Sequence, residues 1–380
     1  MIAPHGGKLV NRHADSESHE RGTDTRAFPK IRLTLEQAKT VENISTGVYS
    51  PLCGFMTSGT LEKVLTDCRL QDGTAWTLPV LLPVPDHTAE QLKHADQAAL
   101  YFEDELIGVL EIADVFQIDK AKLVWSVYGT EDPRHPGVQK VMHYGEWFAG
   151  GDIWAFRYVK SGFPDYKFTP QQTRTMFEAR GWHTVAAFQT RNAPHLRHEY
   201  VQKSALTFSD GLFIQPVLGK KKAGDFTDEA IVRSYQALID HYYRKDNTLL
   251  SVLEYEMEYA GPKEAIHHAI MRKNFGCTHM IIGRDHAGVG NFYSPYAAQE
   301  IFREFPDLEI QPIILNSFFF CKKCEAMANE KTCPHPQCDH VDFSGTKIRK
   351  FFTSGDGDLT GLMRPEVVRE IMNTPNRFVD

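Results

Sequence analysis

Residues 184–218 read TVAAFQTRNAPHLRHEYVQKSALTFSDGLFIQPVL, and this stretch decides the fold class. An apolar run at 184–188 is followed by a polar loop, by a helix expected from about Pro194 to Phe208, and by a second apolar run at 211–218. Two short strands that are joined by a helix run parallel in one sheet, because the helix returns the chain to the edge where the first strand began. The stretch therefore predicts a βαβ unit.

The same alternation of strands and helices continues along the chain. A helix is expected over 227–243 with Thr227 as its N-cap, followed by a strand over 248–253. A further helix opens at Gly261, and a strand follows over 279–283. This pattern predicts an α/β domain with a parallel sheet and crossover helices.

The regions on either side of this domain have a different character. Residues 1–165 are strand-rich and often interrupted by Gly and Pro, with a strand candidate at 105–112, so we expect a compact β-rich domain. From residue 321 a cysteine cluster is followed by a helical tail, which predicts a small C-terminal subdomain. The predicted domains are therefore 1–165, 166–320 and 321–380.

Composition and charge exclude several classes of protein. The chain has 380 residues, 42% hydrophobic and 24% charged, which excludes a disordered chain. Its 42 Lys and Arg against 49 Asp and Glu give a net charge of −7, whereas a general nucleic-acid binder carries excess positive charge. No apolar run approaches the roughly 20 residues that span a bilayer, and the first residues do not resemble a signal peptide. We expect a cytoplasmic protein that binds neither nucleic acid nor membrane.

The polar loop after the first strand carries residue types that bind oxyanions; it contains Gln189, Thr190, Arg191, Asn192, His195 and His198. Arg191 offers a planar fork of donors that suits sulfate, phosphate or carboxylate. His195 and His198 are expected in the first turns of a helix, where free N–H groups and a partial positive charge favour a polyphosphate. Two alternatives stay open: ordinary surface or core histidines, and zinc ligands in a His-x-x-His arrangement. Because no carboxylate or cysteine stands at an obvious third-ligand spacing, we favour the anion site.

A second polar loop follows the strand at 279–283; it contains Arg284, Asp285, His286, Ala287, Gly288 and Gly290. Open α/β sheets bind ligands at the carboxyl ends of their strands, where both loops are expected. Arg284 supplies a second positive charge, and Asp285 is a candidate for orienting Arg284 or for holding a magnesium ion through water. Gly288 and Gly290 allow the backbone to approach a ligand closely. The alternative is a structural loop with a buried Arg–Asp pair.

A third group of residues is a cysteine cluster with the spacing Cys321-x2-Cys324-x8-Cys333-x4-Cys338. Two knuckle-like spacings in a reducing compartment predict a structural zinc site rather than disulfides. Four unpaired thiols would be the alternative, but free structural cysteines usually lie in apolar surroundings, and this segment is rich in Lys, Glu and Asn.

Together these motifs resemble the ATP sulfurylase (sulfate adenylyltransferase) family in its zinc-containing prokaryotic form. The resemblance extends over nearly the whole chain and includes PHGG at 4–7, ENISTGVYSPL at 42–52, HPGV at 135–138, YAGPKEA at 259–265 and RKNFGCTH at 272–279. It implies a PUA-like N-terminal domain and a Rossmann-like nucleotidyltransferase domain. It also implies a homodimer that catalyses ATP + sulfate ⇌ adenosine 5′-phosphosulfate + pyrophosphate with magnesium.

The resemblance further implies roles for the two loops. Gln189 and Arg191 match sulfate-binding positions, helped by the backbone of Ala287. The positions that match catalytic residues are Thr190, Arg191 and Asn192, together with His195 and His198, which match histidines that stabilise phosphates in the transition state. The nucleotide-side loop is matched by Arg284, Asp285 and His286, and Gly288 is expected to contact substrate as well.

The chain departs from the family pattern in two places. Zinc-bearing members commonly close their metal site with three cysteines and a histidine, whereas here Cys338, Asp339 and His340 stand near that position. We expect Cys338 rather than His340 as the fourth ligand, because a thiolate binds zinc strongly. Glu258 stands where the family often has Arg, and we expect its carboxylate to point away from an anion site.

The chemistry needs no covalent enzyme intermediate. Sulfate is a weak nucleophile and both reactants are anions, so the protein must neutralise charge and align sulfate in line with the α-phosphorus. One rival is another adenylyl or cytidylyl transferase that acts on a phosphate or carboxylate. The other is a zinc-ribbon nucleic-acid-binding protein with a PUA-like domain, against which the net charge counts.

Overall fold

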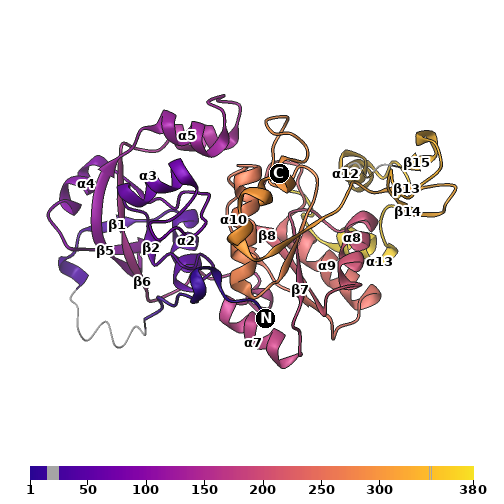
Figure 1. Ribbon diagram of the computed structural model, residues 1–380, viewed down its shortest axis with the longest axis horizontal. Coiled ribbons are helices and arrows are strands. Elements are labelled where there is room, and N and C mark those ends of the chain that lie inside the picture. The colour runs from indigo at the N-terminus through magenta and orange to yellow at the C-terminus, as the bar shows by residue number, and fades with distance from the viewer. Residues whose placement is uncertain (15–24, 342, 344) are drawn as a thin grey trace. The chain divides into compact units, whose positions relative to one another are not determined.

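The computed structural model describes residues 1–14, 25–341, 343 and 345–380 (Figure 1). The chain packs into two compact units, each made of three stretches of sequence. Unit 1 comprises Met1–Met176, Met257–Gly276 and Asp285–Gln311, and unit 2 comprises Phe177–Glu256, Cys277–Arg284 and Pro312–Asp380. These units divide the chain differently from the predicted segments 1–165, 166–320 and 321–380, which stay a prediction about domains.

Unit 1 is built on a six-stranded sheet in the order β1-β4-β5-β6-β2, with β3 also paired to β6. Its strands are β1 (Lys30–Arg32), β2 (Gly54–Phe55), β3 (Pro83–Val84), β4 (Gln97–Phe102), β5 (Glu105–Gln117) and β6 (Trp147–Ala155). The described pairs are antiparallel, apart from β1 with β4. Glycine is required where β2 meets β6, because a Cβ added to Gly54 would lie 1.9 Å from the Gly151 carbonyl oxygen. The β-rich N-terminal region is confirmed.

The helices of unit 1 cover this sheet and extend beyond it. They are α2 (Leu35–Ser45), α3 (Ser58–Asp67), α4 (Asp86–Leu92), α5 (Lys120–Tyr128), α6 (Pro136–Met142), α10 (Pro262–Phe275) and α11 (Ala297–Glu300), with 3-10 turns η1 (His5–Gly7), η2 (Thr25–Ala27), η3 (Pro164–Tyr166), η4 (Ile301–Glu304) and η5 (Pro306–Leu308). One core cluster joins Phe148 of β6 and Phe116 of β5 to Val124 of α5. Helix α10 is buried from Glu264 to Phe275.

Unit 2 is built on a second sheet in the order β10-β8-β7-β11-β12, with β9 also paired to β8. Its strands are β7 (Val185–Thr190), β8 (Gly211–Leu218), β9 (Thr248–Leu250), β10 (Leu253–Glu254), β11 (His279–Ile282) and β12 (Gln311–Ile314). Strands β7 to β11 pair in parallel, and β8 is buried at every position. Such a continuous apolar run is typical of a central parallel strand, and the predicted parallel α/β sheet is confirmed.

The helices and the C-terminal residues complete unit 2. They are α8 (Leu196–Leu206), α9 (Asp228–Tyr242), α12 (Gly345–Ser354) and α13 (Pro365–Asn373), with α7 (Pro170–Ala179) crossing from unit 1 and a small sheet of β14 (Ala326–Ala328), β13 (Phe319–Cys321) and β15 (His340–Val341) beside η6 (Gln337–Asp339). Helix α13 packs on α9, where Arg233 pairs with Glu370 at 3.0 Å. The helical tail therefore packs on α9, a helix of the α/β unit. No helix among the described residues is long and apolar enough to cross a membrane.

Candidate active site

The edge of unit 2 where its parallel strands end brings several predicted residues together. Strand β7 ends at Thr190 and is flanked by β11 on one side and β8 on the other. Because paired parallel strands end at the same edge, the segments that follow them lie side by side. These segments begin at 191 after β7, at 219 after β8 and at 283 after β11.

Backbone contacts hold Arg191 at this edge. Its Nη2 donates to the carbonyl oxygen of Lys220 over 2.7 Å. The backbone N–H of Lys220 in turn donates to the carboxylate of Glu256, with distances of 2.8 and 3.1 Å to the two oxygens. Beside it, the Thr190 hydroxyl accepts the N–H of Asn192 over 3.1 Å. Glu256 therefore helps to fix the backbone of Lys220, whose carbonyl oxygen accepts from the guanidinium. Sequence reasoning missed Glu256, because the link runs through backbone atoms.

A second amide side chain stands beside Gln189. Gln215 of β8 pairs in register with Gln189 of β7, so both side chains lie on one face of the sheet. Both amide atoms of Gln215 are buried without a hydrogen-bond partner among the described residues. Buried polar groups are nearly always paired, so this amide marks a place that water or ligand completes. Sequence reasoning missed Gln215, which looks like part of an apolar strand.

The two histidines of the first loop meet at the start of α8. The helix begins at Leu196, so the prediction that Pro194 is its first residue is wrong; His195 is the N-cap instead, and its Nδ1 accepts the His198 backbone N–H over 3.3 Å. The rings stack with centroids 3.7 Å apart and planes 20° from parallel. Phe188 packs against His198 at 5.3 Å between ring centroids.

Both histidines of this pair are neutral at pH 7. Burial, with the positive charge of Arg197 adding to it, lowers the pKa of His198 to about 3. The pKa of His195 is also well below its usual value, through burial and then through the neighbouring His198 and Arg197. Because His195 Nδ1 accepts a hydrogen bond, its proton resides on Nε2. His198 Nδ1 is buried without a partner among the described residues. The pair thus offers neutral imidazole groups to a ligand.

The second predicted loop divides at Arg284, since Asp285 and the residues after it belong to unit 1. Arg284 and Asp285 are both exposed, so a buried Arg–Asp pair does not describe this loop. Asp285 and Ala287 adopt left-handed backbone, with φ of 57° and 56°. The Ala287 carbonyl accepts the Gly261 N–H over 3.0 Å, which ties the segment to the start of α10.

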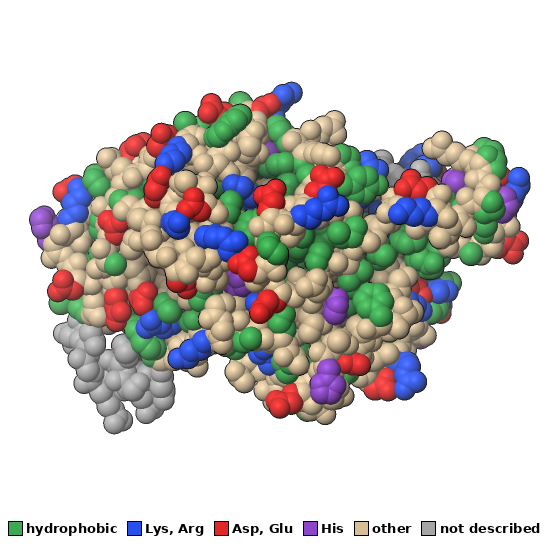
Figure 2. Space-filling model, in the orientation of Figure 1, with side chains coloured by type: hydrophobic (Ala, Val, Ile, Leu, Met, Phe, Trp, Pro, Cys, Tyr) green, Lys and Arg blue, Asp and Glu red, His purple; other side chains and the backbone are tan. Residues whose placement is uncertain are grey.

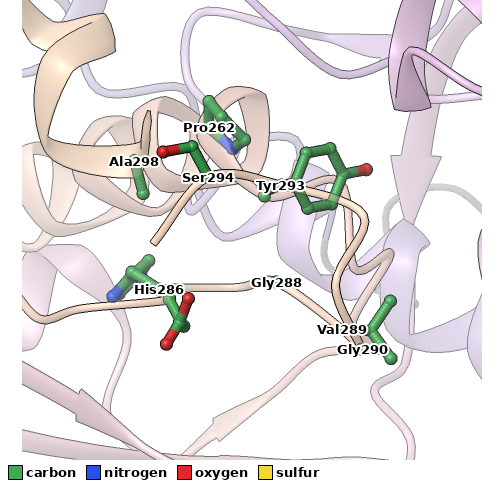
Figure 3. A pocket seen from close by; sticks show the side chains of 10 residues that line it. Pro262, His286, Gly288, Val289, Gly290, Tyr293, Ser294 and Ala298 are labelled. Atoms are coloured by element: carbon green, nitrogen blue, oxygen red, sulfur yellow. The ribbon is translucent and has the colours of Figure 1, made fainter. Parts of the chain in front are cut away.

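A pocket of about 140 Å³ opens beside this segment within unit 1 (Figure 3). Its lining residues come from the loop, from the start of α10 and from the segment before α11; they are Gly261, Pro262, Asp285, His286, Gly288, Val289, Gly290, Tyr293, Ser294 and Ala298. The first turn of a long helix and several small residues at a pocket wall suit a polar ligand that approaches backbone N–H groups. His286, Asp285 and Gly288 all line this pocket.

The predicted behaviour of Glu258 has a structural basis. Its carboxylate pairs with Lys140 at 2.5 Å and accepts a hydrogen bond from the Tyr128 hydroxyl at 3.2 Å. Lys140 also pairs with Glu36. An ion pair and a hydrogen bond within unit 1 therefore hold the Glu258 carboxylate, which shares the charge of Lys140 with Glu36.

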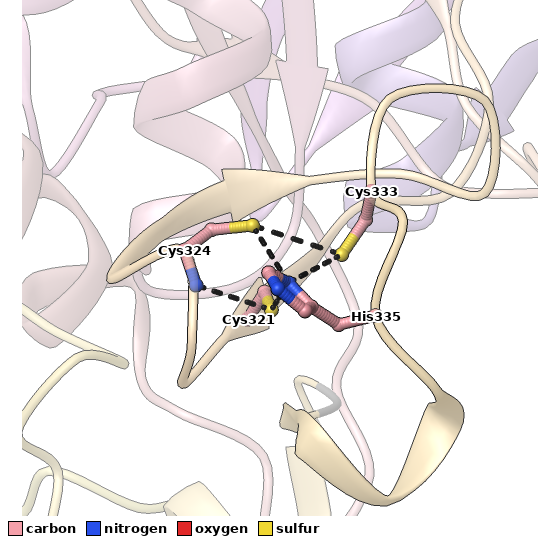
Figure 4. Close-up of side chains that lie close together, drawn as sticks. All are labelled: Cys321, Cys324, Cys333 and His335. Atoms are coloured by element: carbon pink, nitrogen blue, oxygen red, sulfur yellow. Dashed lines mark hydrogen bonds between the residues drawn. The ribbon is translucent and has the colours of Figure 1, made fainter.

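The cysteine cluster lies in unit 2 beside the small sheet (Figure 4). Its members are Cys321, Cys324, Cys333 and His335, whose ligand atoms all lie within 4.8 Å of one another. Sulfur-to-sulfur and sulfur-to-nitrogen distances are 3.8 Å for Cys324–Cys333 and 3.2 to 3.8 Å for the contacts of His335 Nδ1. Tetrahedral zinc requires about 3.8 and 3.6 Å for such pairs. A Cys3His cluster therefore fits zinc.

The expected fourth member of this cluster, Cys338, is not among these four residues. His335 takes that position, while Cys338 is exposed on the turn η6. His340 stands nearby, with its Nε2 3.5 Å from Cys333 Sγ, but its ring stacks on Phe319 at 3.6 Å. The Cys-x-His spacing of Cys333 and His335 is the sequence signal that makes His335 a candidate for the fourth member.

The distribution of charge on the surface is consistent with the net charge of −7 counted from the sequence. On the face drawn in Figure 2, acidic and basic side chains are interspersed rather than gathered into a basic patch. A protein that binds nucleic acid in general would present such a patch.

Comparison with known proteins assigns the chain. A family model described as ATP-sulfurylase matches residues 164–374, and one described as PUA-like domain matches residues 2–158. Sulfate adenylyltransferases of Thermococcus onnurineus and Pyrococcus abyssi are each 48% identical over 378 residues, with 99% of both chains covered. That of Halothermothrix orenii is 43% identical, covering 98% of this chain and 99% of its own.

A solved structure shares the fold. The chain described as a hexameric APS kinase from Thiobacillus denitrificans superposes with a TM-score of 0.76 at 23% identity, over 98% of this chain and 68% of that one. With full-length relatives at up to 48% identity and a family model over more than half of its residues, the chain belongs to the sulfate adenylyltransferase (ATP sulfurylase) family, nucleotidyltransferases that interconvert ATP and sulfate with adenosine 5′-phosphosulfate and pyrophosphate.

Proposed function

We propose that the strand-end loop of unit 2 carries the chemical step, in which sulfate attacks the α-phosphorus of ATP in line and pyrophosphate leaves. The observation that carries this proposal is the arrangement of Arg191 with a stacked pair of neutral histidines at one sheet edge. Attack by sulfate needs alignment and charge stabilisation, and no covalent enzyme intermediate is required.

Sulfate is held by Gln189 and Arg191 in this mechanism. The guanidinium provides two parallel donors that match two oxygens of a tetrahedral anion. One nitrogen of Arg191 rests on the Lys220 carbonyl at 2.7 Å, which limits the rotation of the fork. Thr190 and Asn192 shape the turn between them through their 3.1 Å hydrogen bond.

His195 and His198 act on the phosphates, above all on the departing pyrophosphate. In the free protein, burial keeps both rings neutral. A phosphate oxygen that gains negative charge in the transition state favours the protonated ring, so the hydrogen bond strengthens as the bond to the leaving group breaks. The start of α8 adds a partial positive charge at the same place.

The residues proposed to contact the nucleotide side of the substrate are Arg284, Asp285, His286, Ala287 and Gly288. Arg284 offers an exposed positive charge, and the small residues lie at the wall of the pocket in unit 1. Magnesium bound with ATP would lessen the negative charge on the phosphates, and Asp285 is the candidate to hold it through water.

Zinc is proposed to be structural, held by Cys321, Cys324, Cys333 and His335. Four protein ligands leave no open position for chemistry. The Cys324 backbone N–H lies 3.4 Å from Cys321 Sγ, so the knuckle already satisfies part of the thiolate charge. We also propose a cytoplasmic homodimer.

Sulfate-dependent exchange of labelled pyrophosphate into ATP tests the proposal. The purified protein should exchange label only when sulfate is added, and the Arg191→Ala variant should not. Exchange that responds to a carboxylate or to a phosphate ester instead would assign the chain to another nucleotidyltransferase reaction.

A further inference from the structure

A buried chain of three titratable side chains reaches the pocket wall of unit 1. Glu264 and His268 lie one turn apart on α10 and are fully buried, with His268 Nε2 3.3 Å from Glu264 Oε1. The other nitrogen of the same ring, Nδ1, lies 3.0 Å from His286 Nε2. His286 lines the pocket (Figure 3). Three groups are thus linked in series from the helix interior to the ligand side.

The protonation states of these three side chains follow from the environment of Glu264. The carboxylate of Glu264 accepts the backbone N–H groups of Glu258 and Ala260 over 3.0 and 2.9 Å. Two such donors favour the ionised carboxylate, which can only accept. His268 Nε2, which faces it, therefore carries a proton.

The neutral state of both rings completes the assignment. His268 is buried beside the positive charge of Arg272, which opposes a second proton, so its Nδ1 keeps a lone pair. His286 Nε2 must then donate to that lone pair, and its own Nδ1 is left without a proton. A neutral ring held in this way offers an acceptor to a ligand and no positive charge.

We propose that Glu264 and His268 are positioning residues that fix His286 as the Nε2–H tautomer, so that its Nδ1 accepts a hydrogen bond from a neutral N–H or O–H donor of the nucleotide. This rests on the proposed role of His286 in binding substrate. An amine of the base or a hydroxyl of the ribose has such a donor, whereas a phosphate oxygen does not. His286 thereby contributes to the affinity for ATP, and not to charge stabilisation.

Two amide variants of His268 separate its hydrogen bond to Glu264 from its hydrogen bond to His286. In His268→Asn the amide oxygen occupies the place of Nδ1, so the acceptor for His286 is kept. In His268→Gln the amide nitrogen occupies the place of Nε2, so the donor to Glu264 is kept but the acceptor is lost. Both variants place a similar polar group in the same buried site, which makes each the control for the other.

The kinetic test compares the KM for ATP, the KM for sulfate and kcat. His268→Gln should raise the KM for ATP about tenfold, the effect of one lost hydrogen bond, with kcat and the KM for sulfate within about twofold. His268→Asn should stay within about threefold of the wild type in all three. Equal KM values for ATP in both variants, or a loss confined to kcat, would overturn the proposal.

A direct observation does not depend on either variant folding. Nitrogen NMR of histidine-labelled wild-type protein reports which ring nitrogen of His286 carries the proton, with His286→Gln used to assign the signal. The proposal expects a protonated Nε2 and an unprotonated Nδ1; the opposite tautomer, or a doubly protonated ring at pH 7, would refute it. Because this readout needs no turnover, its failure is distinct from the absence of sulfate-dependent exchange.

Discussion

The two histidine pairs of this enzyme both have pKa values lowered by burial, but different contacts hold them. His195 and His198 stack at 3.7 Å and face Arg197, with no carboxylate among the groups that shift their pKa. His268 and His286 are joined edge to edge by a 3.0 Å hydrogen bond, and His268 faces the carboxylate of Glu264. Burial lowers the pKa of every one of these rings.

These contacts determine what each histidine pair can do chemically. A ring fixed by a carboxylate and a second ring has one available tautomer, so it recognises a donor by position. A stacked pair beside Arg197 is free of such a fixed acceptor, and the approach of an anion changes its proton affinity. The pair of His268 and His286 therefore suits the binding of a neutral group, and the pair of His195 and His198 suits the stabilisation of a charge that develops during the reaction.

The largest effect is expected from Arg191, because charge stabilisation is assigned to the loop of the stacked pair. Arg191→Ala should lower sulfate-dependent turnover about 100-fold or more, since a bidentate contact made in the transition state is lost. Arg191→Lys keeps the charge but lacks the planar fork and should recover only part of the rate. Thermal unfolding should match the wild type, and near-normal turnover in the alanine variant would remove Arg191 from the mechanism.

A metal bound by the stacked pair would contradict its proposed role toward the phosphates. The protein should contain one zinc per chain, lost in His335→Ala and kept in Cys338→Ser, because His335 is the member of the cluster that the structure places with the three cysteines. His195→Ala combined with His198→Ala should keep the zinc. Metal analysis of the purified variants decides between these, and a fall from two equivalents to one in the double variant would make the pair a metal site.

Glu256 acts on Arg191 through the backbone of Lys220 and not through either histidine pair. Glu256→Ala should free the Lys220 peptide and thereby loosen Arg191, with about a tenfold loss in kcat/KM for sulfate. Glu256→Gln keeps an acceptor for the Lys220 N–H and should lose about threefold or less. Steady-state kinetics at saturating ATP measures both; a glutamine variant as impaired as the alanine variant would mean that the charge, and not the hydrogen bond, is what matters.

The last prediction concerns stability in acid rather than turnover. The pKa of His198 is about 3 in the folded chain and 6.5 as its ordinary value, so the unfolded chain takes up the proton first as pH falls. Stability is therefore complete above about pH 6.5 and declines below it, by up to about 1.4 kcal/mol per pH unit for this histidine. Urea unfolding of the wild type and of His198→Ala between pH 7 and 4 should show a shallower decline in the variant. Parallel curves would exclude His198 as a contributor.

Sequence reasoning reached the parallel sheet because its strands are apolar and short. The run at 211–218 was expected as a strand and forms β8 with the same bounds. The start of α8 was misplaced because an imidazole N-cap leaves no local signal beside Pro194, whose fixed φ suits a first helical position. Contacts such as His268 with His286 join residues that sequence alone places on separate elements.

The metal cluster is a second case in which the sequence pattern does not determine which residues come together. The spacing of Cys321, Cys324 and Cys333 predicts a metal site, but the choice between Cys338 and His335 depends on how the turn η6 folds, which the spacing does not contain. Likewise, residues 257–276 and 285–311 belong to unit 1 because they pack against segments that are distant in the sequence. Local patterns thus predict the elements and the loops, while long-range contacts select the partners.

The different roles of the two histidine pairs are tested by kinetics of His198→Ala and His268→Gln. The quantities to compare are kcat and the KM for ATP, measured in parallel in both directions of the reaction. We expect His198→Ala to lower kcat about 10- to 100-fold in each direction with little change in the KM for ATP, and His268→Gln to raise the KM for ATP and keep kcat. The same pattern in both variants, or the reverse assignment, would contradict this expectation.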